Sequence, residues 1–256
     1  MTLPSTFSIG AALVFSTGSP YVLILYDIPA RLRPVSSDPD ADAQTGTEPV
    51  GSTSPEAHYF DDDPTVPSAP VTIDVMLPDT AFTLETDRGV FSRGHVDTGT
   101  NLLLRTDLPI ASTGHLLDLG AGAGPIALAM ARRSPNATVW AVDVNSRARH
   151  LCTRNAKQNG ITNLRAVAPD DVPNDIRFAT VWSNPPVRIG KTAMRALLLD
   201  WLARLDNNGI AALVVQKHLG ADSLQRWLQS AGHPTERITS KAGFRLLSVG
   251  PKSARP

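Results

Sequence analysis

A glycine-rich segment that follows a short apolar run constrains this chain more than any other feature. Residues 115–128 read HLLDLGAGAGPIAL, with Gly120, Gly122 and Gly124 at every second position. Glycines at this spacing let the backbone turn tightly and approach a ligand where a Cβ atom would block it. The pattern therefore predicts a strand, a ligand-binding turn and a helix, the repeating unit of a parallel α/β sheet.

The residues around the turn indicate which ligand it holds. A dinucleotide-binding fingerprint would need glycine at position 125, where this chain has Pro125, a favourable first residue of a helix. Asp118, just before the turn, would repel a phosphate but suits a cationic ligand. Asp143 ends the next apolar run and can accept hydrogen bonds from both ribose hydroxyls, although it could also simply cap the strand end. An adenosyl cation satisfies this combination better than a dinucleotide does.

The stretch Asn184-Pro185-Pro186-Val187 follows another apolar run and carries a second set of chemical groups. Two prolines hold the chain rigid, so the Asn184 carboxamide and the Pro185 carbonyl can together accept the two hydrogens of an NH2 group. Methyl transfer from a sulfonium to an amine needs an oriented lone pair more than it needs an acid or a base. Alone, the sequence could be only a rigid loop. Together with the glycine turn, it indicates methyl transfer to a planar nitrogen.

These segments resemble the class I S-adenosylmethionine-dependent methyltransferases, and more narrowly the "methyltransferase small" group that includes the RsmC-like ribosomal RNA guanine-N2 methyltransferases. The resemblance runs from about residue 58 to about residue 249. It is most specific at residues 89–104 (GVFSRGHVDTGTNLLL) and at residues 184–191 (NPPVRIGK), the form found in short, single-domain members. Longer members carry a second, N-terminal methyltransferase-like domain, which we do not expect in this chain.

The resemblance implies S-adenosyl-L-methionine as the cofactor and assigns roles to individual residues. Asp118 and the glycines would bind the methionine part, Asp143 the ribose and Asp170 the adenine amine. Asn184 and Pro185 would be the catalytic pair that holds the target amine. The expected cofactor-binding residues are Asp97, Thr98, Gly99, Asp118, Gly120, Ala121, Gly122, Gly124, Asp143, Val144, Asp170 and Asn184.

The residues after the Asn-Pro-Pro turn bear on the substrate. Enzymes of this fold that methylate adenine or a protein glutamine usually carry an aromatic residue there, and Val187 supplies no aromatic face. Arg188 and Lys191 can instead donate to phosphate or to the acceptor edge of guanine, unless they are solvated charges at a helix start. We therefore expect Pro186, Val187, Arg188 and Lys191 to contact a guanine, methylated at N2, in small-subunit (16S) ribosomal RNA. Another RNA, a protein amide, or a catalytically silent nucleoside-binding module are the alternatives.

Composition and charge divide the chain into two parts. Residues 35–57 contain five acidic residues and no Lys or Arg, so we expect residues 1–57 to be a disordered, low-complexity extension. Because the whole chain is neutral and residues 1–57 carry −4, residues 58–256 carry +4, which suits ribosomal RNA or the small ribosomal subunit as a partner. We expect residues 58–256 to form one methyltransferase domain, with a hairpin and lead-in segment at 58–104 and the catalytic core at 105–250.

The same composition argues against several other classes of protein. Two apolar runs, residues 9–15 and 21–26, are too short to span a membrane and lack the basic start of a secretory signal, so we expect a cytoplasmic protein without a membrane partner. The single cysteine, Cys152, excludes an internal disulfide, and its surroundings favour a core position. The histidines show no metal-ligand spacing, so no metal is expected. The sequence does not indicate an oligomeric state.

Strand and helix patterns alternate along the domain and predict its fold class. The expected elements are a hairpin at 71–77 and 81–86, strands at 138–143, 164–167, 178–182 and 210–216, helices at 125–133, 146–159 and 192–206, and an antiparallel pair at 236–239 and 244–249. This order predicts an α/β fold with a doubly wound, mostly parallel, Rossmann-like seven-stranded sheet and an N-terminal β-hairpin extension. Four predicted site residues fall at or just past strand ends, so we expect them at one edge of the sheet. They are Asp118, Asp143, Asp170 and Asn184.

Overall fold

The computed structural model describes residues 67–186 and 189–253. In this part of the chain, a two-stranded hairpin precedes a seven-stranded sheet flanked by α-helices. The strands are β1 (Val71–Met76), β2 (Ala81–Thr86), β3 (Thr113–Leu119), β4 (Asn136–Val142), β5 (Leu164–Val167), β6 (Phe178–Ser183), β7 (Leu205–Gln216), β8 (Thr235–Lys241) and β9 (Phe244–Val249). The helices are α1 (Thr98–Arg105), α2 (Pro125–Arg133), α3 (Ser146–Gln158), α4 (Lys191–Leu202) and α5 (Ala221–Ser230), with 3-10 turns η2 (Pro169–Asp171) and η4 (Lys217–Leu219). The extension expected at residues 1–57 lies outside the described residues.

The order of strands in the large sheet is β5-β4-β3-β6-β7-β9-β8. The first five strands pair in parallel, β9 runs antiparallel to β7, and β8 runs antiparallel to β9. The predicted doubly wound, mostly parallel seven-stranded sheet and the N-terminal hairpin are therefore confirmed. The winding reverses between β3 and β6, which is where sheets of this class bind their ligands.

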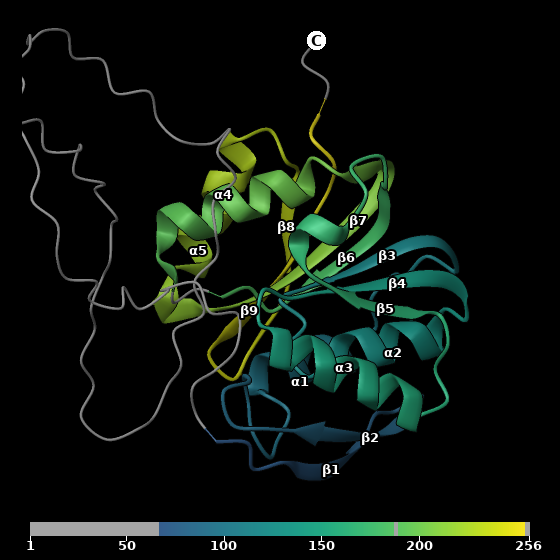
Figure 1. Ribbon diagram of the computed structural model, residues 1–256. Coiled ribbons are helices and arrows are strands. Elements are labelled where there is room, and N and C mark those ends of the chain that lie inside the picture. Colours follow the sequence, from purple (N-terminus) through teal and green to yellow (C-terminus); the bar gives the residue numbers. More distant parts are fainter. Residues whose placement is uncertain (1–66, 187–188, 254–256) are drawn as a thin grey trace, which may run out of the picture.

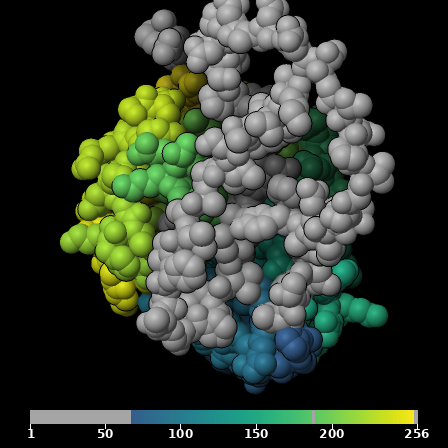
Figure 2. Space-filling view, turned by 60° about the vertical axis from the view of Figure 1, so that its left-hand side comes forward, coloured from purple at the N-terminus to yellow at the C-terminus, as the bar shows by residue number. Residues whose placement is uncertain are grey.

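The sheet is buried on both faces, so the chain builds two cores. Helices α1, α2 and α3 cover one face, with the hairpin beyond them, while α4 and α5 cover the other (Figure 1). Because side chains alternate along a strand, Leu116 of β3 packs into the first core and Leu117 into the second. In the turned, space-filling view, the hairpin forms the blue surface at the bottom and the C-terminal segments form the green and yellow surface at the left (Figure 2).

Two asparagines, Asn155 in α3 and Asn159 at its C-cap, attach the hairpin to the domain. Asn155 Oδ1 accepts from the backbone N–H of Glu85 (2.8 Å), and Asn155 Nδ2 donates to the carbonyls of Glu85 (2.8 Å) and Ala123 (2.9 Å). One helical turn later, Asn159 makes the same pair of bonds to the backbone of Thr83, at 3.0 and 2.7 Å. These side chains supply β2 with the hydrogen bonds that a further strand would make. The hairpin is therefore fixed against α3, beside the glycine-rich turn.

The predicted elements need two corrections. A helix over residues 192–206 is wrong at its end, because α4 stops at Leu202 and Leu205 begins β7. Leu205 is buried, and a buried residue that continues a helical stripe can equally begin the next strand, so periodicity does not separate the two. Helices α1 and α5 are absent from the prediction, although Leu224 and Leu228 of α5 are buried at the spacing of a helix face.

Candidate functional site

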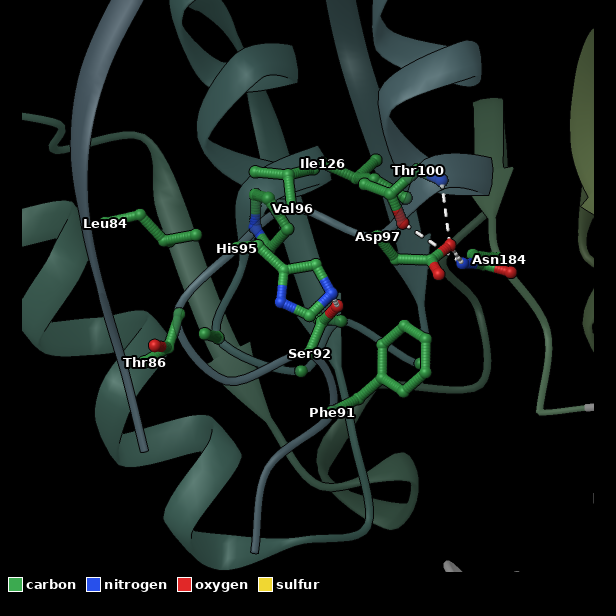
Figure 3. Close-up of a pocket in the computed structure, with 15 residues that line it drawn as sticks. Leu84, Thr86, Phe91, Ser92, His95, Val96, Asp97, Thr100, Ile126 and Asn184 are labelled. Carbon is green, nitrogen blue, oxygen red and sulfur yellow. Dashed lines mark hydrogen bonds between the residues drawn. The ribbon is translucent and has the colours of Figure 1, made fainter. Parts of the chain in front are cut away.

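A cleft opens at the carboxyl edge of β3, between the glycine-rich turn and the segment that joins the hairpin to α1 (Figure 3). Side chains from the hairpin, from α1, from the start of α2 and from the end of β6 meet there. The lining residues are Leu84, Thr86, Phe91, Ser92, His95, Val96, Asp97, Thr100, Gly120, Ala121, Gly122, Ala123, Pro125, Ile126 and Asn184. Five predicted site residues are thus brought together: Asp97, Gly120, Ala121, Gly122 and Asn184.

The glycine-rich turn forms one wall of the cleft. The backbone N–H groups of Gly120 and Ala121 donate to the Val142 carbonyl at 2.8 and 3.1 Å, which ties the turn to the end of β4. Gly124 adopts a left-handed conformation, with φ +91°, as the N-cap of α2. A Cβ atom at Gly124 would lie 2.5 Å from Cys152 Sγ. Gly124 therefore serves the close packing of α2 against α3, whereas Gly120 and Gly122 face the cleft.

Asp118 lies beneath the turn and does not line the cleft. Its Oδ2 accepts from the backbone N–H of Ala127 (2.9 Å), and its buried Oδ1 has no hydrogen-bond partner within the described residues. Burial, with a smaller contribution from the charge of Asp143, raises the pKa of Asp118 to about 8 despite the bond from Ala127. Asp118 thus supports the first turn of α2 below the backbone that faces the ligand, and its unpartnered oxygen is of a kind that often marks a functional site.

Asp143 follows β4 and, like Asp118, is buried outside the lining of the cleft. Its Oδ2 accepts from the N–H of Gly122 (2.8 Å) and its Oδ1 from the N–H of Asn145 (2.9 Å). Burial raises the pKa of Asp143, against the effect of these hydrogen bonds. Asn145 also donates from Nδ2 to the carbonyl of Gly89 (2.8 Å), so the segment before α1 is anchored beside this carboxylate. A carboxylate offers about four lone-pair sites, so these bonds leave Asp143 some capacity to accept from a hydroxyl.

The remaining predicted cofactor residues lie outside the lining of the cleft. Val144 follows Asp143, and Asp170 is exposed in η2, just past the end of β5. Thr98 is exposed on the first turn of α1, and Gly99 is buried behind it. The four strand-end residues do gather along one edge of the sheet, as the sequence predicts, but this edge extends beyond the cleft itself.

Asn184 closes the cleft from the side of β6. Its Nδ2 donates to Asp97 Oδ2 at 2.9 Å and to Thr100 Oγ1 at 3.1 Å (Figure 3). No hydrogen bond within residues 67–186 and 189–253 reaches Asn184 Oδ1 or the Pro185 carbonyl. Two consecutive residues at the reversal point of the sheet therefore each carry an acceptor that no donor within the described residues occupies.

The predicted substrate residues follow this turn. The carbonyl of Pro186 accepts from the N–H of Ile189 (3.2 Å), and Lys191 is exposed as the first residue of α4. Val187 and Arg188 lie outside the described residues. A cation at a helix N-terminus opposes the helix dipole, so Lys191 gains no stabilisation from the helix itself.

Phe91 and His95 are among the lining residues that have no role in the sequence prediction. The ring of Phe91 is 54% exposed although it is apolar, and Figure 3 shows it beside Asp97 and Asn184. His95 lies next to it, with Nε2 3.2 Å from Ser92 Oγ and Nδ1 3.1 Å from the Arg93 carbonyl. Both lie in the segment GVFSRGH, so the motif could have pointed to them, but only the fold shows which of its side chains reach the cleft.

The part of the chain that the structure describes also bears on a membrane span and on a metal site. No helix there has the length and the apolar surface that crossing a membrane would require. No group of three or more His, Cys, Asp or Glu side chains there is arranged to hold a metal ion.

The sheet order, the glycine-rich turn and the Asn-Pro-Pro turn on the two sides of the reversal point define a class I methyltransferase fold. Residues 81–248 match the "Methyltransferase small domain" family, and the chain therefore belongs to this family of S-adenosylmethionine-dependent methyltransferases. The backbone of residues 120–123 and the Asp97 and Asn184 side chains offer such a cofactor a polar, partly anionic cleft at the expected edge of the sheet, so the residues present fit it.

Similar proteins include members whose names describe ribosomal RNA methylation. "Uncharacterized protein YbxB" of Bacillus subtilis (strain 168) is 34% identical over 195 residues, which are 75% of this chain and 97% of that protein. "Ribosomal RNA small subunit methyltransferase C" of Aeromonas hydrophila is 34% identical over 174 residues, 66% of this chain and 49% of that protein. The structure of the T. thermophilus 16S rRNA N2 G1207 methyltransferase (RsmC) with AdoMet and guanosine has a TM-score of 0.62 at 23% identity, covering 73% of this chain and 52% of that one. This chain thus spans about half the length of these two methyltransferases.

Proposed function

We propose that this protein methylates the exocyclic N2 amine of a guanine in small-subunit (16S) ribosomal RNA, a reaction of the cytoplasm. The observation that carries the proposal is the acceptor pair at the cleft, Asn184 Oδ1 and the Pro185 carbonyl, which no donor within the described residues occupies. An NH2 group on a planar ring offers two hydrogens in one plane, and two adjacent acceptors match it. The relative named as a ribosomal RNA small subunit methyltransferase and the similar structure named as a 16S rRNA N2 G1207 methyltransferase support guanine as the ring.

The reaction requires little from the protein beyond the orientation of the target amine. When bound, S-adenosylmethionine supplies a methyl group activated by the adjacent sulfonium. The exocyclic amine of guanine is conjugated with its ring, so its lone pair is delocalised above and below the ring plane and is weakly nucleophilic. On gaining the methyl group, the nitrogen would release one proton to solvent. Acceptance of both N–H groups by Asn184 and Pro185 would hold the nitrogen in place and stabilise the positive charge that develops on it, by the same logic as an oxyanion hole of opposite sign.

The cofactor roles proposed for individual residues differ in kind. Gly120, Ala121 and Gly122 would contact the cofactor through their backbone, and Asp97 would lie beside it. Asp143 would accept the ribose hydroxyls, with the bonds from Gly122 and Asn145 holding its carboxylate in one orientation. Asp118 would not touch the cofactor but would support the glycine-rich turn that does. Asp170, just past the end of β5, would bind the adenine amine.

The exposed ring of Phe91 supports a nucleobase as the substrate. Enzymes that act on a base take it out of its stack and hold it against aromatic or apolar faces, and Val187 offers no aromatic face. Phe91 lines the same cleft beside Asn184, and its 54% exposure leaves an aromatic side chain available to a base. Lys191 would contribute a contact to the RNA backbone.

The proposal is tested by treating candidate substrates with the enzyme and a methyl-labelled donor, then identifying the labelled nucleoside by mass spectrometry. The substrates are naked 16S RNA, small subunits lacking the modification, and total ribosomal protein. We expect label in N2-methylguanosine from one of the two RNA substrates. Label in methyladenosine, or in an amide of ribosomal protein, would contradict the proposal and select one of the alternatives, and no label in any substrate would favour a silent nucleoside-binding module.

A further inference from the structure

The orientation of the Asn184 amide decides whether the proposed acceptor pair exists. An asparagine side chain keeps nearly the same shape when its amide turns by half a revolution, which exchanges the oxygen for the NH2 group. With NH2 turned into the cleft, donors would face the donors of the target amine. A neighbouring group must therefore hold the amide with its oxygen toward the substrate.

The two contacts of Asn184 Nδ2 differ in what they can enforce. Thr100 Oγ1, at 3.1 Å, belongs to a hydroxyl that can either donate or accept, so it tolerates both orientations. Asp97 Oδ2, at 2.9 Å, belongs to a carboxylate that can only accept and would repel the amide oxygen. Asp97 therefore discriminates between the two orientations, and Thr100 completes the pair of bonds.

Asp97 is itself held firmly. It is the N-cap of α1, where Oδ2 also accepts from the N–H of Gly99 (2.8 Å) and of Thr100 (3.3 Å). The helix terminus favours the negative charge. A Cβ atom at Gly99 would lie 2.7 Å from the ring of Phe244 in β9, so the first turn of α1 packs tightly against the sheet. The orientation imposed on Asn184 thus derives from a helix that lies 87 residues earlier in the chain.

We propose that Asp97 is a positioning residue, which fixes the Asn184 amide with Oδ1 toward the target amine. The inference rests on the proposed function, in which Asn184 accepts that amine. The negative charge also strengthens the acceptor, because a charge-assisted bond at the NH2 end polarises the amide toward its oxygen. In this proposal, the Asp-x-Gly-Thr segment at residues 97–100 lines the cleft with Asp97 and Thr100 and also contributes to the reaction, by orienting Asn184.

The methylation rates of variants at Asp97 and Thr100 test this role. Asp97→Ser keeps an N-cap side chain for α1 but is too short to reach Asn184. At saturating RNA and donor, we expect its methylation rate to fall about 10- to 100-fold, approaching the loss in Asn184→Ala, with little change in the KM for RNA. Thr100→Val, which removes the hydroxyl and keeps the shape, should lose less, and Thr100→Ser, which keeps the hydroxyl, should retain a rate near that of the parent.

A double-mutant cycle separates positioning from a general structural role. If Asp97 acts through Asn184, Asp97→Ser should lower the rate by less than about twofold in the Asn184→Ala background, because the group to be oriented is already gone. If the two losses multiply, Asp97 has an independent role and the inference is overturned.

A measurement without substrate keeps the inference separate from the choice of substrate. In 15N NMR spectra, the side-chain amide hydrogens of Asn184 should exchange slowly in the parent and in Thr100→Ser, and at least about tenfold faster in Asp97→Ser, because the charge-assisted bond protects them. That result supports the inference even if the methylated base is not guanine, which would defeat the proposed function alone. Exchange that Asp97→Ser leaves unchanged would overturn the inference.

Discussion

The contact between Gly124 and Cys152 allows a quantitative test of why the glycine-rich turn has its third glycine. In Gly124→Ala, the new Cβ would lie 2.5 Å from Cys152 Sγ and 3.3 Å from Cys152 Cβ. The backbone would also have to keep φ +91° with a side chain present. Left-handed backbone costs a non-glycine residue about 1 to 2 kcal/mol, and overpacking a core costs about 1 to 3 kcal/mol. We therefore expect the free energy of unfolding to fall by about 2 to 5 kcal/mol.

The two contributions can be separated by a second substitution. Cys152→Ala alone removes one buried sulfur and should cost about 1 kcal/mol. In the double variant the 2.5 Å contact is gone, so the overpacking part of the loss should be recovered while the backbone part remains. The coupling between the two substitutions, measured from urea unfolding of all four proteins, should therefore be about 1 to 3 kcal/mol in favour of the double variant. Additive losses would refute the packing explanation, and an unchanged stability with weakened cofactor binding would show that Gly124 serves the ligand instead.

Three other predictions follow from the site. Asp143→Ala should weaken S-adenosylmethionine binding by about 1.5 to 3 kcal/mol, the loss of charge-assisted hydrogen bonds to ribose, and calorimetry that finds equal affinity in a folded variant would contradict the assignment. Because the pKa of Asp118 is about 8 when folded and near 3.8 when unfolded, this group binds a proton more tightly in the folded state. Its contribution to stability is full below about pH 4 and is lost as the pH rises to about 8. The free energy of unfolding of Asp118→Asn should accordingly fall less than that of the parent between pH 5 and pH 9. If urea unfolding shows the same pH dependence for both proteins, the raised pKa of Asp118 is contradicted. Lys191→Ala should weaken RNA binding and make its salt dependence shallower by about one unit, as expected for one phosphate contact, whereas an unchanged slope would place Lys191 off the RNA.

The sequence predicts the fold well because its strongest signals are local. Pro125 at the first helical position and the apolar run before Asp118 specify the strand, turn and helix at the glycine-rich segment, and α2 has the predicted bounds Pro125–Arg133. The end of α4 is less predictable, since Leu205 satisfies both the helical stripe and the start of a strand.

The site is predictable only in part, because contacts between distant segments decide which groups face the ligand. Strand-end position predicts that Asp118 and Asn184 lie at one edge, but not that Asp118 turns beneath the helix and that Asn184 turns into the cleft. The bond from Asn184 to Asp97 joins residues 87 positions apart, and the attachment of β2 by Asn155 depends on a helix and a hairpin that the sequence suggests separately. Contacts between segments so far apart in the chain leave no periodic pattern in the sequence.

Under the proposed function, Asn184 acts by orienting the target amine. The most direct test is the rate of methyl transfer to RNA by Asn184→Ala, measured at saturating RNA and donor so that weaker docking cannot imitate a loss of chemistry. We expect the rate to fall by about 100-fold or more while donor affinity stays within a few fold, as when an interaction made in the transition state is lost. A variant that turns over RNA as fast as the parent would contradict the account and leave the Asn-Pro-Pro turn a purely structural element.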